Sequence, residues 1–251
     1  MTVEHGGKPV YGATVGILML EARFPRILGD IGNALTWPFP VQYRVVRGAS
    51  PDRVVRYRAE GTTEAFIAAA QDLVASGVDG ITTTCGFLSL VQAEVSAAVE
   101  VPVATSALMQ VPLVQSLLPP GKRVGVLTIS KSTLTEDHLK AASVPLDTPV
   151  AGTEGGREFT DAILEDRLEI DFAACRLDLL DAALALLEEH PEVGAIVLEC
   201  TNMVPFAADI RKATGLPVYS IYTFVTWFQS GLMPRAFPLE LGDPRLPPSS
   251  I

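Results

Sequence analysis

The chain repeats one order of elements, strand, cysteine, helix and short strand, with constant spacing. Cys85 and Cys200 are 115 residues apart, and the Val-Pro-Val segment 101–103 and the Leu-Pro-Val segment 216–218 are offset by the same 115 residues. No gap interrupts the correspondence around the cysteines. An internal repeat of this size favours two pseudo-symmetric α/β lobes. The alternative explanation of the repeat is that any two βαβ units resemble each other.

Short apolar runs typical of buried strands alternate with segments whose apolar residues recur at helical spacing. This pattern predicts an α/β fold with a mainly parallel sheet flanked by helices in each lobe. We assign residues 1–118 with 222–251 to the first lobe and 119–221 to the second, and expect the active site in the cleft between them. Residues 1–11 and 239–251 are expected to be arms. The expected strands lie at 14–20, 41–46, 79–84, 102–105, 124–129, 194–199 and 216–218, and the expected helices at 62–76, 88–99 and around 179–187.

The composition limits the partners of the chain. A formal net charge of −10 opposes binding to nucleic acid or to anionic membranes. No apolar run approaches the roughly 20 residues of a membrane span, and residues 1–8 have no signal-peptide core, so we expect a soluble cytoplasmic protein with a small-molecule carboxylate or amide as partner. The apolar stretch 221–233 either covers the first lobe or forms the contact of a homo-oligomer.

The two repeated cysteines each follow a predicted strand and precede a predicted helix. Ligands of parallel sheets bind beyond the carboxyl ends of the strands, and a thiol at a helix N-terminus has a lowered pKa. We therefore predict two reactive thiols. The predicted substrate contacts that flank them are Thr84, Gly86, Phe87, Thr201 and Asn202. A free cysteine is otherwise usually packed in the core, as we expect for Cys175 on the apolar stripe of its helix.

Two thiols that face each other across a cleft suit proton transfer at a carbon stereocentre. One thiolate removes the proton, and the opposite thiol returns a proton to the other face. This scheme requires neither a metal nor a coenzyme. The glycine-rich nucleotide motifs and the C-x-x-C motif do not occur in the sequence.

Three segments resemble the aspartate/glutamate racemase superfamily, which includes hydantoin racemases, maleate isomerases and arylmalonate decarboxylases. They are TTTCGF at 82–87, VGVLT at 124–128 and LECTNM at 198–203. The resemblance implies two lobes, no cofactor, and an acid/base pair formed by Cys85 and Cys200. It also implies that Gly86, Thr201 and Thr128 line the substrate.

The sequence departs from the glutamate and aspartate racemase patterns in three places. Gly86-Phe87 stands where Asn-Thr is usual, Asn202 stands where glutamate racemases carry histidine, and a long loop at 23–33 replaces a short Asp-Ser-Gly turn. The loop offers Arg26, Asp30 and Asn33 to the cleft, where a cation and a carboxylate could hold a substrate. Ordinary turn and surface roles are the alternative for these three residues.

The sequence thus predicts a cofactor-independent isomerase, a racemase or epimerase acting at the α-carbon of a small amino acid, hydantoin or related carboxylate. One alternative keeps the fold and changes the chemistry to maleate-type cis-trans isomerisation or arylmalonate-type decarboxylation. Another is a bilobal small-molecule binding protein without catalysis.

Overall fold

The computed structural model describes residue 3 and residues 5–237. The strands are β1 (Val15–Leu20), β2 (Val41–Val46), β3 (Gly80–Thr83), β4 (Val103–Ala104), β5 (Arg123–Thr128), β6 (Val150–Gly152), β7 (Val193–Leu198) and β8 (Val218–Tyr219). They form two four-stranded sheets, ordered β2-β1-β3-β4 and β6-β5-β7-β8, in which every pair of neighbours is parallel. The predicted fold class is confirmed. The predicted arm at 239–251 lies outside the described residues.

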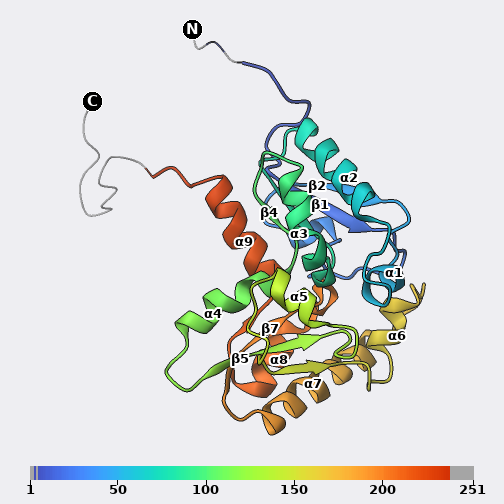
Figure 1. Cartoon of the computed structure of the whole chain (residues 1–251), viewed down its shortest axis with the longest axis vertical. Coiled ribbons are helices and arrows are strands. Elements are labelled where there is room, and N and C mark those ends of the chain that lie inside the picture. Colours follow the sequence, from blue (N-terminus) through green and yellow to red (C-terminus); the bar gives the residue numbers. More distant parts are fainter. Residues whose placement is uncertain (1–2, 4, 238–251) are drawn as a thin grey trace, which may run out of the picture.

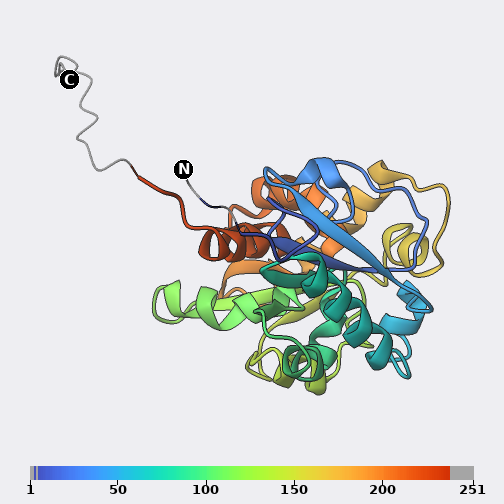
Figure 2. The ribbon, with the colours of Figure 1, turned by 90° about the horizontal axis from the view of Figure 1, so that it is seen from above.

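Helices flank both sheets (Figure 1). They are α1 (Pro51–Val55), α2 (Thr63–Ser76), α3 (Gln92–Ala97), α4 (Val111–Leu117), α5 (Glu136–Ala141), α6 (Phe159–Leu164), α7 (Phe172–Glu189), α8 (Ala207–Thr214) and α9 (Ile221–Leu232), with 3₁₀ helices at Ala34–Thr36, Gly86–Val91, Ala107–Gln110 and Thr201–Phe206. In Figures 1 and 2, α9 lies on the side of the molecule opposite to α1 and α6.

The 115-residue repeat is a repeat of the backbone. Ile81 of β3 pairs with Val103 of β4, and Ile196 of β7 pairs with Val218 of β8, so the strand register is conserved at the same offset. The 3₁₀ helices that follow Cys85 and Cys200 also begin and end at corresponding positions. The sequence spacing therefore reflects two copies of one strand-cysteine-helix unit.

The predicted helix at 88–99 is wrong over its first four residues. A 3₁₀ helix occupies 86–91, and α3 begins only at Gln92. Five of the six residues in that 3₁₀ helix are buried, so the segment shows no apolar stripe from which its geometry could be predicted. Strand β6 was not predicted, because three half-buried residues carry too little pattern.

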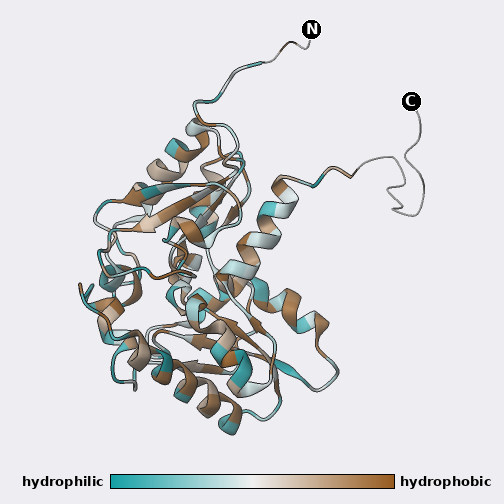
Figure 3. Ribbon diagram, turned by 180° about the vertical axis from the view of Figure 1, so that it is seen from behind, coloured by the Kyte–Doolittle hydropathy of each residue, from teal (hydrophilic) through white to brown (hydrophobic). Residues whose placement is uncertain are grey.

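The long helices follow the patterns expected of them. Helix α2 buries Phe66 and Leu73 and ends at Gly77, whose φ of 107° is the left-handed conformation that closes a helix. Helix α7 is capped by the Asp171 carboxylate and buries Cys175, which is 1% exposed, as predicted. The alternation of apolar and polar faces along the outer helices is visible in Figure 3.

The C-terminal helix α9 covers one face of the first sheet. Its Phe224 and Val225 belong to an apolar cluster with Val15 and Ile17 of β1. Of the two roles considered for residues 221–233, the structure shows the covering role. Trp227, which stacks on Phe224, is 61% exposed. The assignment of 222–251 to the first lobe, and the lobe boundaries as a whole, stay predictions.

Within residues 5–237, every helix is too short or too polar to cross a membrane.

Gly80 of β3 provides a test of the packing of α9. A Cβ at this position would lie 2.5 Å from Leu232 Cδ1 and 2.7 Å from the Phe228 ring. We expect Gly80→Ala to lower the free energy of unfolding in urea by about 1–3 kcal/mol through overpacking. Gly155→Ala is the matched control, because a Cβ there meets nothing within 4 Å. Equal stability of the two variants would contradict the packing described.

Candidate active site

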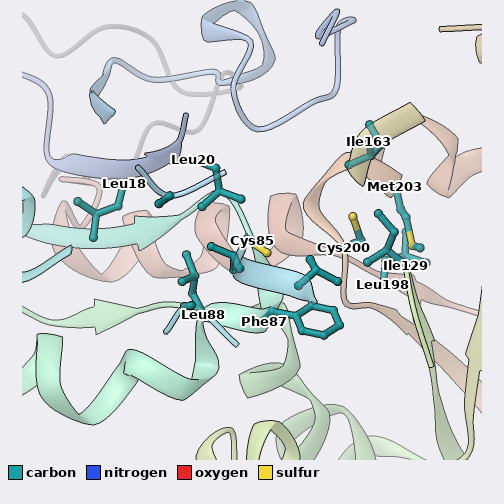
Figure 4. Packing of buried hydrophobic residues seen from close by; sticks show 14 of the residues in the cluster. Leu18, Leu20, Cys85, Phe87, Leu88, Ile129, Ile163, Leu198, Cys200 and Met203 are labelled. Atoms are coloured by element: carbon teal, nitrogen blue, oxygen red, sulfur yellow. The ribbon is translucent and has the colours of Figure 1, made fainter. Parts of the chain in front are cut away.

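The carboxyl ends of β3 and β7 bring Cys85 and Cys200 into one narrow pocket between the lobes. Both residues are free thiols, 8% and 7% exposed. The pocket is lined by the two cysteines and by Leu20, Phe24, Arg26, Pro51, Val55, Thr84, Ile129, Ile163, Leu164, Glu199 and Asn202. Figure 4 shows the thiols inside the apolar cluster that joins the lobes, with Leu88 on the side of Cys85 and Met203 on the side of Cys200.

Extended backbone at each cysteine ends the strand and aims the side chain toward the other lobe. Thr83 Oγ1 accepts a hydrogen bond from the Cys85 amide at 3.3 Å. Across the junction, Thr201 Oγ1 donates to the Thr84 carbonyl at 2.7 Å. Because this bond is buried and joins the two residues that flank the cysteines, it sets the approach of the two strand ends.

The 23–33 loop reaches the pocket through a chain of hydrogen bonds. The Cys200 thiol lies 3.6 Å from Asn202 Oδ1, and Asn202 Nδ2 donates to Asp30 Oδ2 at 2.6 Å. The other carboxylate oxygen, Asp30 Oδ1, accepts from Arg26 Nη1 at 2.8 Å. Arg26 lines the pocket, whereas Asp30 holds Arg26 and Asn202 in place. Asn33 caps the 3₁₀ helix at Ala34–Thr36 and donates to the Arg26 carbonyl, which is a role in the loop itself.

Four further predicted site residues lie beside the pocket without lining it. Phe87 is buried and packs edge-on against the His138 ring, with 4.8 Å between ring centroids. Thr201 is used in the bond between the lobes. Gly86 and Thr128 contact a residue that the sequence prediction did not include, Glu199.

Glu199 is a fully buried carboxyl group directly before Cys200. Thr128 Oγ1 donates to Glu199 Oε2 at 2.7 Å, while Oε1 has no hydrogen-bond partner. An added Cβ at Gly86 would overlap Oε1, so the glycine makes room for the carboxyl group. A comparison of the two repeats contains the missed signal, because the position before the cysteine is Thr84 in one copy and Glu199 in the other.

The pKa values of the site correct the sequence prediction. Burial raises the pKa of both thiols, and the charge of Glu199 raises both further. The amides of Phe87 and Leu88 do lower the pKa of Cys85, as expected near a helix start, but this effect is smaller than that of burial. Burial also raises the pKa of Glu199 to about 7. The resting site therefore holds neutral thiols beside a carboxyl group that titrates near neutral pH.

A contact between the lobes closes the site on the side of the 23–33 loop. Asp166 Oδ1 accepts from the amides of Arg23 at 2.6 Å and Phe24 at 2.9 Å. Phe24 lines the pocket, as do Ile163 and Leu164 just before Asp166. These bonds tie the loop of the first lobe to the segment that follows α6 in the second. Both thiols of the pocket are buried.

In the part of the chain that the structure describes, no group of three or more His, Cys, Asp or Glu side chains is arranged to hold a metal ion.

Comparison with solved structures identifies the scaffold. An allantoin racemase from Klebsiella pneumoniae superposes with a TM-score of 0.60 at 16% identity, over 87% of each chain. A variant of arylmalonate decarboxylase superposes with a TM-score of 0.59 at 16% identity, over 87% of this chain and 92% of the decarboxylase. The chain has the aspartate/glutamate racemase superfamily fold.

Comparison of sequences finds relatives that are named for another activity. The chain is 25% identical over 229 residues to a protein of Durusdinium sp. clade D named dimethylsulfoniopropionate lyase, covering 88% of this chain and 75% of the lyase. It is 28% identical to dimethylsulfoniopropionate lyase 3 of Emiliania huxleyi, of whose length it spans 60%. No protein-family model matches the chain.

The buried carboxyl group predicts a pH dependence of stability. The pKa of Glu199 is about 7 in the folded protein and near its ordinary value of 4.5 in the unfolded chain. The unfolded state therefore ionises first, and stability is lost as the pH rises from below 4.5 through 7. The whole loss amounts to about 3 kcal/mol. We expect Glu199→Gln to remove this decline, measured as urea unfolding free energies at pH 5 and pH 8.

The matched control is Glu188→Gln, on the exposed face of α7. It should keep the decline of the parent protein. The same decline in Glu199→Gln would show that Glu199 ionises freely in the folded state.

The Asp166 contact predicts how fast the thiols react. Asp166 has a φ of 54°, so glycine can replace it without backbone strain. We expect Asp166→Gly to speed modification of Cys85 and Cys200 by iodoacetamide about tenfold. This corresponds to a loss of ~1.4 kcal/mol in the free energy that favours the closed over the open site. Labelling of each cysteine is followed by mass spectrometry. Asp161→Ala, an exposed change in α6, should leave the rate unchanged. Parent-like labelling of Asp166→Gly would show that the contact does not close the site.

Proposed function

We propose that this chain is a lyase that removes a proton from the carbon next to a carboxylate and expels a thioether from the following carbon. Dimethylsulfoniopropionate is the proposed substrate. The observation that carries the proposal is the meeting of two thiols from different lobes in one apolar pocket. The similarity to proteins named dimethylsulfoniopropionate lyase supports this choice of substrate.

The elimination needs one base and no electron transfer. One cysteine, as thiolate, takes the α-hydrogen as a proton. The C–H electron pair forms the double bond between the α- and β-carbons, and the electron pair of the carbon–sulfur bond leaves with dimethyl sulfide. Acrylate is the second product, and the cysteine then passes its proton to water.

The pocket suits the substrate in polarity. Leu20, Ile129 and Ile163 present aliphatic groups to its interior. They can contact the methyl groups of a sulfonium and of the uncharged sulfide that leaves. Desolvation also favours the step in which the thiolate and the sulfonium lose their opposite charges, since the products are a neutral thiol, a neutral sulfide and the acrylate anion.

A second candidate is racemisation or epimerisation of a small amino acid, hydantoin or related carboxylate. The position of the cysteines at equivalent points of opposite lobes favours it, because proton removal and return on opposite faces require two groups. The likeness in fold to allantoin racemase is compatible with it. The two candidates share the first step and differ in whether a leaving group departs.

The test is release of dimethyl sulfide from dimethylsulfoniopropionate, measured by gas chromatography of the headspace. We expect the parent to be active, and Cys85→Ala or Cys200→Ala to lower kcat/KM by about 10²–10⁴ for the cysteine that acts as the base. Cys175→Ala is the matched control, since this cysteine lies in the core of the second lobe. It should keep the activity.

Other outcomes separate the remaining functions. Absence of dimethyl sulfide from the parent protein contradicts the lyase proposal. Uptake of deuterium from D₂O at the α-carbon of amino acids or hydantoins, lost in both Cys85→Ala and Cys200→Ala, would instead establish the racemase. Release of carbon dioxide from an arylmalonate would indicate decarboxylation. Binding with no turnover of any of these compounds would indicate a binding protein.

A further inference from the structure

The pocket has one polar atom that the protein leaves without a partner. Among the described residues, Glu199 Oε1 is one of four buried side-chain polar atoms with no hydrogen bond, and it alone of the four belongs to a residue lining the pocket. A buried polar group without a partner is destabilising, so its retention calls for an explanation. Thr128 holds the other oxygen and so fixes the direction of the carboxyl group.

The other polar groups of the pocket each have at least one partner within the protein. The Arg26 guanidinium is paired with Asp30 at 2.8 Å and lies 4.4 Å over the Phe24 ring. Amides at the starts of the two 3₁₀ helices, those of Phe87, Leu88 and Asn202, lower the pKa of the cysteine thiols. Asn202 donates its side-chain N–H to Asp30. Among the described residues, the Arg26 guanidinium donates through Nη1 alone, to Asp30, so a substrate carboxylate can be held jointly by Arg26 and by a protonated Glu199.

We infer that Glu199, in its protonated form, donates a hydrogen bond from Oε1 to the carboxylate of the substrate. This inference rests on the proposed function in taking a carboxylate as the substrate group. Two ionised carboxylates would repel each other in a buried pocket, whereas an acid and a carboxylate share a strong, charge-assisted hydrogen bond. Glu199 is thus a catalytic residue that touches the substrate.

The surroundings of Glu199 favour the protonated form. The titratable groups around the pocket are Cys85, Cys200 and the Arg26–Asp30 pair, and in the described residues no cation lies within salt-bridge distance of Glu199. Burial already raises the pKa of Glu199 to about 7. A bound carboxylate adds a second negative charge and raises this pKa further. Binding of the substrate therefore keeps Glu199 protonated, which is the form that donates the hydrogen bond.

The same bond assists the chemistry. Removal of the α-proton moves negative charge onto the carboxylate oxygens of the substrate. The hydrogen bond that Glu199 donates to one of these oxygens therefore becomes stronger as the charge develops. Glu199 is placed for this role by its position next to Cys200 on the strand end. A protonated Glu199 also removes one negative charge from beside the thiols, which makes the thiolate easier to form.

The experiment measures binding of propanoate, an unreactive carboxylate, with propanamide as the uncharged control ligand. Affinity is measured by NMR titration from pH 6 to pH 9, and proton uptake by calorimetry in buffers of different ionisation enthalpy. We expect the dissociation constant of the parent to rise about tenfold per pH unit above 7, with nearly one proton taken up at pH 8.5. Propanamide binding should take up no proton.

Two variants separate hydrogen-bond donation from simple charge repulsion. Glu199→Gln removes the charge and keeps an N–H donor, so it should bind propanoate with an affinity independent of pH and without proton uptake. Glu199→Ala removes both and should bind about tenfold more weakly than Glu199→Gln. An infrared band of a protonated carboxyl group, formed with propanoate at pH 8 in the parent and missing in Glu199→Gln, identifies the residue directly.

The inference is overturned if the parent does not bind propanoate, if binding takes up no proton, or if Glu199→Gln and Glu199→Ala bind equally well. These results are distinguishable from failure of the lyase proposal. Dimethyl sulfide release without proton uptake on propanoate binding rejects the role of Glu199 alone. Proton-linked propanoate binding without dimethyl sulfide release keeps that role and rejects the lyase.

Discussion

The structure depends on the burial of two strand ends against each other. Parallel strands end with polar groups at one edge of a sheet, and here the carboxyl edges of two sheets meet with little room for water between them. Each polar group at the junction must then find a partner in the protein. Thr201 bonds the Thr84 carbonyl, and Asn202 bonds Asp30, both across the lobes. These bonds bring Cys85 and Cys200 together, and they leave Glu199 as the group whose partner must come from outside.

Burial also sets the chemistry of the junction. A thiol in water at a helix start would ionise readily, but the thiols here lie in an apolar pocket next to a carboxyl group, and their pKa values are raised instead. A thiolate can form in such an apolar pocket only if its solvation changes or if the substrate supplies a compensating charge. A zwitterion that loses its positive charge during the reaction fits a pocket of this kind better than a substrate that stays charged throughout.

The shared fold explains why fold comparison and sequence comparison point to different reactions. Racemases, decarboxylases and the proposed lyase all need a carbanion or enolate next to a carboxyl-type group, and all can use a strand-end thiol to handle its proton. The fate of that intermediate depends on what else the substrate carries, such as a sulfonium that can leave. Similarity of scaffold below 25% identity therefore establishes the architecture, and the contents of the pocket must decide the reaction.

The sequence by itself determined the duplicated α/β plan, most of its strands and the equivalent strand-end positions of Cys85 and Cys200, because apolar patterning and a constant spacing are local properties of the chain. It could not determine the acidity of the thiols or the pairing of Arg26 with Asp30. Nor did it reveal Glu199 as part of the site. These features depend on burial and on contacts between distant residues, such as Asn202 and Asp30, which are 172 positions apart. Only the tertiary structure brings such groups together, and a buried charge takes its properties from those neighbours.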